Sequence, residues 1–189
     1  PLQWGLVPWW AKTSQEGARL SNARAEGIAS KPAFREAFRK RRCVVPASGF
    51  YEWQTIGKLK FPWYFQMRDE SPFLFAGLWE TWRSPEGVTL ETCALITTTP
   101  NPVVAAVHDR MPVILRDAAV DTWLEASLEA PAQLEPLLGP VPGELMMSTP
   151  VSPRMNSVRH DGPDCIERVE PPRAAPTAPA NPQLSLGLE

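Results

Sequence analysis

Residues 43–67 decide the fold, and they read CVVPASGFYEWQTIGKLKFPWYFQM. Their apolar and aromatic residues come in short stretches separated by turn residues, and they do not recur at helical spacing. In the stretch 50–54, every second residue would face the same side, as in a strand. Residues 55–58 suit a hairpin turn into a second strand over 61–67. We therefore predict two antiparallel strands here.

The same pattern continues along the rest of the chain. Further strands are predicted over residues 73–82, 88–99, 113–115 and 144–149, with turns at 69–72 and 84–87. Short helices are predicted over 31–41, over 102–107 and from an N-cap at Asp117 to about 127, with a helix or turn over 131–138. The chain is thus expected to be a β-meander with a few short helices.

The composition is that of an ordinary globular protein. The chain has 189 residues, of which 43% are hydrophobic and 21% are charged. We predict one domain over residues 1–170 and a Pro/Ala-rich, disordered tail over 171–189. The longest apolar runs are far short of the ~20 residues that a membrane span requires. A soluble, cytoplasmic protein without a membrane partner is therefore expected.

Three cysteines, Cys43, Cys93 and Cys165, stand at wide spacing. Their odd number fits a reducing compartment better than a disulfide scaffold. The sequence contains no CxxC motif, which excludes a zinc ribbon. We expect neither a metal ion nor a cofactor.

The charges are distributed unevenly along the chain. Residues 1–60 hold eleven Lys/Arg and four Glu, a net charge of +7, whereas residues 61–189 hold eight Arg and seventeen Asp/Glu, a net charge of −9. The sharpest basic cluster is residues 35–42, which include Arg39 and Arg41. Beside exposed aromatic residues, such a block is typical of a surface that binds a phosphate backbone. A solvated helix end whose basic residues complement the helix dipole would show the same pattern.

Two residues stand out as candidates for proton transfer. Glu52 lies among aromatic residues on a predicted strand, and it either faces solvent or is buried. Burial would raise its pKa and make it a usable general acid or base. His108 precedes Asp109 in a loop and could shuttle protons near neutral pH, although a lone histidine is more often structural. The chain has no GxSxG nucleophile elbow, so a hydrolase triad is not indicated.

Two other short stretches carry recognition chemistry. Trp9 and Trp10 would point to opposite sides of an extended segment, so at least one should be accessible as a stacking platform rather than lie in the core. Residues 21–26, Ser-Asn-Ala-Arg-Ala-Glu, combine an amide, a guanidinium and a carboxylate. The other interpretation of this stretch is a capped helical turn.

Several fragments occur in a fixed order along the chain. They are Trp4-Gly5, Pro8-Trp9-Trp10, Asn22-Ala23-Arg24-Ala25-Glu26, residues 42–53, His108-Asp109-Arg110-Met111-Pro112, Thr149-Pro150-Val151-Ser152 and Asn156. Together, from about Gln3 to Val169, they resemble the SOS response-associated peptidase family, whose members shield abasic sites in single-stranded DNA. Each fragment is short, but the ordered set is specific.

The resemblance implies an α+β fold, a mainly antiparallel β pseudo-barrel with flanking short helices, and a basic, aromatic-lined groove. In this family an N-terminal cysteine attacks the ring-opened abasic aldehyde. Its amine forms a Schiff base and its thiol closes a thiazolidine, which is a stable DNA–protein crosslink, and a self-processing peptidase activity accompanies this chemistry. The implied partner is single-stranded DNA with abasic sites, bound by a monomer.

The matching motifs also imply roles for individual residues. Asn22 would orient the reacting groups, Glu52 would be the general acid/base, and His108 would assist proton transfer at the opened sugar. Arg24 and Arg110 would hold phosphates, Trp9 or Trp10 would stack or wedge at the lesion, and Thr97 would form a wall of the site. From the charge pattern, we expect Arg39 and Arg41 of the basic cluster to line the same groove.

The sequence departs from the family pattern at the nucleophile, because the chain begins at Pro1. A thiazolidine needs the amine and the thiol on one residue, so none of the three internal cysteines can replace the N-terminal one. Pro1 offers an amine without a thiol. We expect that the natural N-terminal segment is missing from this sequence. The alternatives are a non-catalytic single-stranded DNA-binding module and a conventional peptidase, for which no nucleophile–base pair is found.

Overall fold

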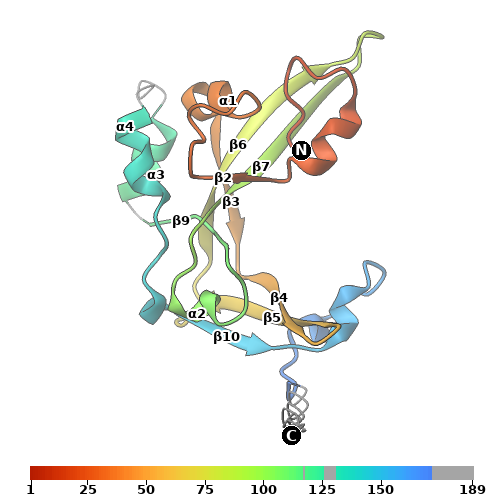
Figure 1. The fold of residues 1–189 in the computed structure, drawn as a ribbon, viewed down its shortest axis with the longest axis vertical. Coiled ribbons are helices and arrows are strands. Elements are labelled where there is room, and N and C mark those ends of the chain that lie inside the picture. Colours follow the sequence, from red (N-terminus) through yellow and green to blue (C-terminus); the bar gives the residue numbers. More distant parts are fainter. Residues whose placement is uncertain (117, 126–130, 172–189) are drawn as a thin grey trace, which may run out of the picture.

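Two sheets, one larger and one smaller, make up most of the molecule. The computed structural model describes residues 1–116, 118–125 and 131–171. The seven-stranded sheet contains β1 (Gln3–Trp4), β2 (Asn22–Arg24), β3 (Arg42–Ala47), β6 (Phe73–Arg83), β7 (Thr89–Thr98), β8 (Met111–Pro112) and β9 (Ile114–Leu115). The three-stranded sheet contains β4 (Phe50–Ile56), β5 (Leu59–Met67) and β10 (Met146–Pro150). Figure 1 shows the larger sheet in the upper part of the molecule and the smaller one crossing below it.

The long strands β6 and β7 form the centre of the larger sheet. They pair antiparallel with each other, and β3 and β9 add to β6 in the same sense. On the other side, β1 and β2 pair with β7 in parallel, and β8 pairs with it antiparallel. Three separate segments therefore meet along β7.

Both faces of β6 are buried, because its residues alternate between two hydrophobic clusters. Ala76 and Leu78 pack with the helices, around Phe38 and Trp123. The opposite face carries residues such as Phe75, which packs toward the smaller sheet with Phe65 and Met146 of β5 and β10. The burial of both faces explains why this segment is apolar at almost every position.

Short helices and 3₁₀ turns flank the two sheets. They are α1 (Arg35–Lys40), α2 (Pro102–Ala105), α3 (Ala118–Leu124) and α4 (Pro131–Leu134), with 3₁₀ turns η1 (Ser14–Arg19), η2 (Glu135–Leu138), η3 (Gly143–Leu145), η4 (Pro153–Asn156) and η5 (Pro163–Ile166). Of these, α1 and α3 pack on β3. Arg42 joins them, since its guanidinium donates to the main-chain oxygens of Phe38 and Trp123 at 3.0 and 2.6 Å and also to those of Arg39 and Glu125.

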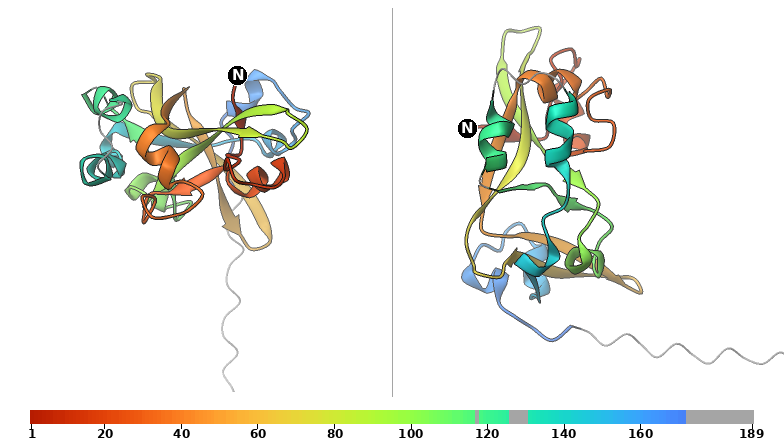
Figure 2. Two further views of the ribbon diagram at one scale, coloured as in Figure 1. Left: turned by 90° about the horizontal axis from the view of Figure 1, so that it is seen from above. Right: turned by 90° about the vertical axis from the view of Figure 1, so that its left-hand side faces the viewer.

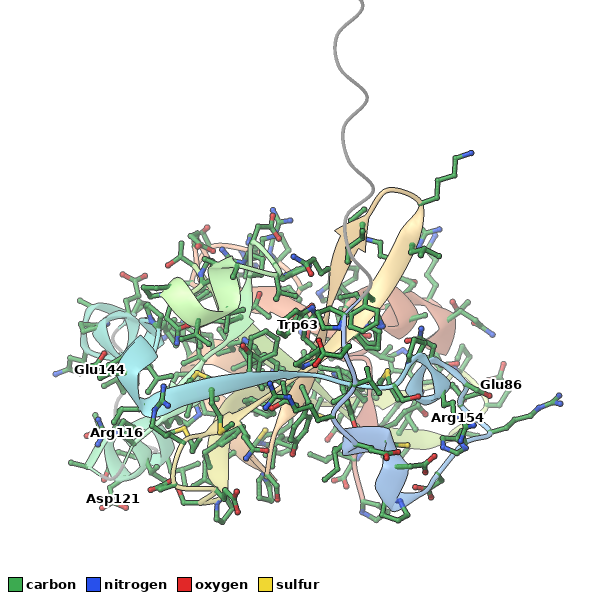
Figure 3. All side chains as sticks on the ribbon, turned by 90° about the horizontal axis from the view of Figure 1, so that it is seen from below. Trp63, Glu86, Arg116, Asp121, Glu144 and Arg154 are labelled. Atoms are coloured by element: carbon green, nitrogen blue, oxygen red, sulfur yellow. The ribbon has the colours of Figure 1, made fainter. Side chains whose placement is uncertain are left out.

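The chain passes from the larger to the smaller sheet within two residues, between Ala47 and Phe50. The Tyr64 ring lies directly over Gly49, so a larger residue at this crossing would have to displace the ring. The β4–β5 hairpin projects from the molecule (Figure 2). Figure 3, seen from below, shows β10 crossing the underside between the end near Glu144 and the end near Arg154, and Trp63 of β5 lies opposite Pro150.

The predicted α+β class, with mainly antiparallel strands and short flanking helices, is confirmed, and the described strands form two sheets that do not close into a barrel. The helix predicted over 31–41 is shorter, because residues 32–34 form turns before α1 begins. The strand predicted over 113–115 is β9, and the two residues before Val113, expected in a loop, form β8 on a different partner. Asp117, the helix end at 126–127 and tail residues 172–189 lie outside the described part of the chain.

The guanidinium of Arg42 is expected to stabilise the fold rather than to bind a ligand. We expect Arg42→Ala to lower the free energy of unfolding by about 2–3 kcal/mol, because several main-chain oxygens lose a charged donor at once. Urea unfolding measures the change. Lys40→Ala, on the exposed side of α1, is the matched control and should change stability by less than about 0.5 kcal/mol. Equal effects of the two variants would contradict this role.

Candidate functional site

Glu52 lies on the inner face of β4. On the same face, Phe50 stacks on Phe65 with ring centroids 5.2 Å apart and meets the edge of Phe75 at 6.0 Å. This packing turns the Glu52 face toward the larger sheet and leaves the Glu52 side chain only 21% exposed. The alternative that the sequence left open is thus decided in favour of partial burial.

The carboxyl group of Glu52 has a raised pKa. Burial is the main cause, since it disfavours the charged form, and the nearby Asp109 carboxylate raises the pKa further. His108 acts in the opposite direction and lowers it, but by less than burial raises it. Glu52 therefore holds a proton more readily than an exposed glutamate does.

His108 faces Glu52 from the loop that follows α2. Its Nδ1 lies 3.6 Å from Glu52 Oε2 and 3.4 Å from Asp109 Oδ1. The loop is fixed at its start by the buried Asn101, whose side chain accepts from the N–H groups of Val103 and Val104 and so caps α2. The structure therefore brings two of the three predicted catalytic residues together, although 56 positions separate Glu52 and His108.

The main chain of Arg110 can hydrogen-bond to the His108 ring whether the ring is neutral or charged. Its N–H lies 3.1 Å from His108 Nδ1, and its carbonyl oxygen lies 3.2 Å from the same atom. A neutral ring with a bare Nδ1 accepts from the N–H and carries its proton on Nε2. A charged ring can instead donate from Nδ1 to the carbonyl oxygen. The loop thus holds the ring in place while a proton comes and goes.

Asn22 and Arg24 are exposed on β2, at the edge of the larger sheet. The register pairs Asn22 with Leu95 and Arg24 with Thr97 of β7, and Thr97 also pairs with Pro112 at the end of the His108 loop. The predicted residues Asn22, Arg24 and Thr97 therefore share the sheet edge that carries the loop. Within the described residues, no hydrogen bond or ion pair joins Asn22 to Glu52 or His108.

Arg110 is engaged inside the protein. Its guanidinium forms two bonds to the Glu26 carboxylate, at 2.7 and 2.9 Å, and a third to the main-chain oxygen of Thr97 at 2.6 Å. The pKa of Glu26 is lowered, mainly by this hydrogen bonding. The predicted phosphate contact of Arg110 thus involves a side chain that already has a carboxylate partner.

The tryptophan pair lies beside α1. Trp9 and Trp10 are 62% and 48% exposed, so both rings are accessible, where the sequence required only one. They line a cleft of about 460 Å³ together with Pro32, Arg35, Glu36, Arg41 and Glu80. Of the two cluster residues singled out in the sequence, Arg41 is bound to the buried Glu80 at 2.6 Å, and Arg39 is not among the lining residues.

The chain also resembles proteins that have been characterised. The sequence model of the SOS response associated peptidase (SRAP) family matches residues 1–158. The chain belongs to the SRAP family. Abasic site processing protein YoqW of Bacillus subtilis is 42% identical over 167 residues, which cover 88% of this chain and 75% of that protein. Abasic site processing protein HMCES of Gallus gallus is 35% identical over 193 residues, which cover 89% of this chain and 57% of that protein.

Solved structures show the same fold. A protein from Bacteroides thetaiotaomicron superposes with a TM-score of 0.82 at 32% sequence identity, over 89% of this chain and 76% of the other. A protein from Bordetella bronchiseptica superposes with a TM-score of 0.70 at 27% identity, over 80% of this chain and 76% of the other. The arrangement of two sheets and short helices is therefore an SRAP fold.

Sequence reasoning missed part of the wall around the Glu52–His108 pair. A cleft of about 590 Å³ is lined by Glu52, Trp53, Lys60, His108, Met155, Asn156 and Val158. Trp53 donates from Nε1 to Asn156 Oδ1 at 2.7 Å, which ties the segment around η4 to β4. Trp53 and Asn156 belong to the motifs quoted above. Lys60, Met155 and Val158 carry no signal in the sequence, because only the folded chain brings them to this cleft.

One internal cysteine, Cys43, lies close to Cys93. Burial raises the pKa of the Cys43 thiol to about 11, and Cys93 nearby adds to the effect, so Cys43 is not a ready nucleophile. Among the residues that the structure describes, no group of three or more His, Cys, Asp and Glu could hold a metal ion. In the same part of the chain, no helix is long and apolar enough to span a membrane.

The raised pKa of Glu52 predicts a pH-dependent stability. Between its ordinary value of 4.5 and its raised value, the folded chain binds more protons than the unfolded chain, so the contribution of Glu52 to stability falls as pH rises. Glu52→Gln should therefore gain stability relative to the wild type between about pH 4 and about pH 7. Urea unfolding at both pH values measures this gain, with Glu91→Gln on exposed β7 surface as control. A difference that is equal at both pH values would contradict the desolvation of Glu52.

Proposed function

We propose that this SRAP chain processes abasic sites in single-stranded DNA and forms the acid–base and DNA-binding part of a covalent crosslinking enzyme. The observation that carries the proposal is the contact between Glu52 and His108, 3.6 Å apart in an open cleft. The relatives YoqW and HMCES, both named abasic site processing proteins, support the substrate class.

The proposed reaction joins an N-terminal cysteine to the ring-opened abasic sugar. The cysteine amine adds to the C1′ aldehyde, and the resulting carbinolamine takes up a proton on its hydroxyl group and loses water to give an iminium ion. The thiol then gives up its proton and its sulfur adds to the iminium carbon, which closes a thiazolidine whose nitrogen keeps its own proton. One water is released and nothing is oxidised or reduced. The cysteine is not among residues 1–189, so the proposal concerns a protein that carries this chain together with such a residue.

Glu52 is suited to both proton transfers of this reaction. Its raised pKa provides a carboxylic acid that can protonate the departing hydroxyl group of the carbinolamine. The carboxylate that remains can accept the thiol proton during ring closure. His108, beside Glu52, would assist proton transfer at the opened sugar, and Asn22 would orient the reacting groups from β2. The same acid–base pair would serve the self-processing peptide cleavage that the family name denotes.

The DNA strand would be bound by the exposed tryptophans and by arginines. Bases stack on Trp9 or Trp10, which need no particular sequence because every base has a π-face. Arg24, exposed on β2 beside Thr97, would hold a phosphate close to the reacting sugar. On the cleft beside the tryptophans, Arg35 is the exposed cluster residue, whereas Arg41 has Glu80 as a partner. We place the continuation of the groove there.

The second candidate function is a single-stranded DNA-binding module without chemistry. The exposure of Trp9, Trp10 and Arg24 favours it, since binding of a single strand needs no nucleophile. Both functions use the same tryptophans and arginines, so binding measurements alone do not separate them. A covalent product does.

The complete gene product that contains this chain should form a covalent adduct with uracil-excised single-stranded DNA, visible as a shifted band on a denaturing gel. Glu52→Gln keeps the size of the side chain and removes its titration. It should slow the adduct by about 10²–10⁴-fold, with nearly unchanged affinity for single strands. No shifted band with the wild type leaves only the binding module. A normal rate in Glu52→Gln, or a parallel loss of DNA binding, would show that Glu52 is structural.

Arg24→Glu should weaken the binding of single-stranded DNA to a similar degree for different sequences, because phosphate contacts position the strand and do not read bases. The loss should be largest at low salt, since binding releases counterions. Fluorescence anisotropy with several labelled oligonucleotides measures it. Arg116→Glu, at an exposed arginine that lines neither cleft, makes the same charge change and is the control. Unchanged affinity of Arg24→Glu at low salt would remove Arg24 from the binding surface.

A further inference from the structure

The buried side chain of Asn101 joins the start of the His108 loop to the smaller sheet. Asn101 comes shortly after β7 of the larger sheet and is only 4% exposed. Its Nδ2 group donates to the main-chain oxygen of Val141 at 3.0 Å and to the sulfur of Met146 at 3.2 Å. Met146 is the first residue of β10, which belongs to the smaller sheet. One amide group therefore connects a segment that leaves the larger sheet to a strand of the smaller one.

The other half of the same amide holds the turn that leads to His108. Asn101 Oδ1 accepts from the N–H groups of Val103 and Val104 at 3.1 and 3.0 Å. The carbonyl oxygen of Val104 in turn accepts from the main-chain N–H of His108 at 2.9 Å. The main chain of His108 is thus linked to the side chain of Asn101 through one turn of α2.

The amide of Asn101 uses both of its donors and accepts twice. These are the four hydrogen bonds that an asparagine side chain can make in full, and all four are present here. The oxygen and the nitrogen cannot exchange places without the loss of these bonds, so the network assigns one orientation to the amide. A buried polar group that is fully satisfied makes its surroundings rigid. Asn101 is therefore suited to hold two elements at a fixed separation.

The surroundings of the amide are apolar and closed. Val104, Met111 and Met146 are fully buried and belong to one hydrophobic cluster with residues of β5. The sulfur of Met111 accepts from the main-chain N–H of Asn101 at 3.2 Å, so the two ends of the loop meet. A hydrogen bond removed here leaves its remaining partner buried, and this costs more than the loss of the same bond at the surface.

Glu52 and His108 come from different parts of the fold. Glu52 is on β4, which is joined through β5 to β10 in the smaller sheet. His108 is on the loop between β7 and β8 of the larger sheet. The separation of 3.6 Å between Glu52 Oε2 and His108 Nδ1 therefore depends on how the loop is attached to the smaller sheet.

We propose that Asn101 is a positioning residue for Glu52 and His108, because its Oδ1 holds the turn that leads to His108 and its Nδ2 fastens this turn to the smaller sheet. The effect of Asn101 on the crosslinking rate rests on the proposed function, whereas its effect on the separation of the two side chains does not. Loss of the Nδ2 bonds lets the loop shift relative to β4. Proton transfer at the opened sugar then loses its alignment.

Asn101→Ser tests the Nδ2 half of the amide. A serine hydroxyl can still cap α2, but it lacks the amide nitrogen that bonds to Val141 and Met146. At saturating abasic DNA, this variant of the complete protein should crosslink about tenfold to 10²-fold more slowly per folded molecule, as expected when a reacting group is displaced by about 1 Å. Its affinity for intact single strands should equal that of the wild type, because Asn101 is buried. An unchanged rate, or an equal loss of rate and affinity, would overturn the proposal.

Met146→Leu keeps the proposal testable if Asn101→Ser does not fold, since it exchanges apolar side chains of similar volume. It removes only the sulfur acceptor, so the rate should fall about two- to fivefold, as for the loss of one weak hydrogen bond. Met147→Leu is the matched control, because Met147 is next on β10, faces the other side of the strand and has its sulfur near Gln66 Nε2. Equal crosslinking rates in these two variants would overturn the proposal.

The titration of the Glu52 carboxyl group, followed by its ¹³C signal without DNA, does not depend on activity. Burial raises the pKa of Glu52, and His108 lowers it by a smaller amount. His108→Gln should therefore raise this pKa further in the otherwise wild-type protein. In Asn101→Ser the same substitution should raise it less, because the interaction weakens with distance. An equal rise in both proteins would overturn the positioning role. If the wild type forms no crosslink at all, the proposed function fails, and the titration still decides whether Asn101 sets the separation.

Discussion

The antiparallel pairing of β6 and β7 is the constraint on which the rest of the structure depends. Helices cover one face of β6, and the smaller sheet covers the other. With its faces buried, the larger sheet can grow only at its edges, and β7 receives β1, β2 and β8 at neighbouring positions along one strand. The segments that carry Asn22, Arg24 and the His108 loop are therefore neighbours because one strand offers them hydrogen bonds. The candidate site therefore forms where separate segments pair with β7.

Burial of Glu52 follows from the same arrangement and has a cost in stability. The face of β4 that carries Phe50 must pack on the larger sheet, and Glu52 shares that face two residues later. A carboxyl group there loses hydration without gaining a charged hydrogen-bond donor of the strength that Glu26 finds in Arg110. A fold selected for stability alone would favour an apolar residue at this position. A carboxylic acid held beside a histidine in an open cleft is instead what proton transfer requires.

The sequence predicted where the strands lie, but not which strands pair or which distant side chains meet. Residue alternation located β4 and β5 because each strand shows its own period, and turn residues marked the ends of β6 and β7. Alternation could not say which face of β4 is the inner one, since that depends on Phe75, a residue of the other sheet. The parallel pairing of β2 with β7 and the Glu26–Arg110 pair, 84 positions apart in sequence, also had no local signal. Motif order pointed to candidate site residues, but it could not show that the sheet register brings the His108 loop and β2 to the same strand.

The number of basic residues in the N-terminal half does not show which of them are available to bind a ligand. Within the cluster at residues 35–42, Arg41 is held by Glu80, and Arg42 donates to four main-chain oxygens between α1 and α3. These two side chains satisfy groups of the protein, and a phosphate would have to compete with bonds that the fold needs. The charge that remains for a ligand is at exposed positions such as Arg24 and Arg35. In the function we propose, these exposed arginines, and not the cluster as a whole, would set the direction of the DNA groove.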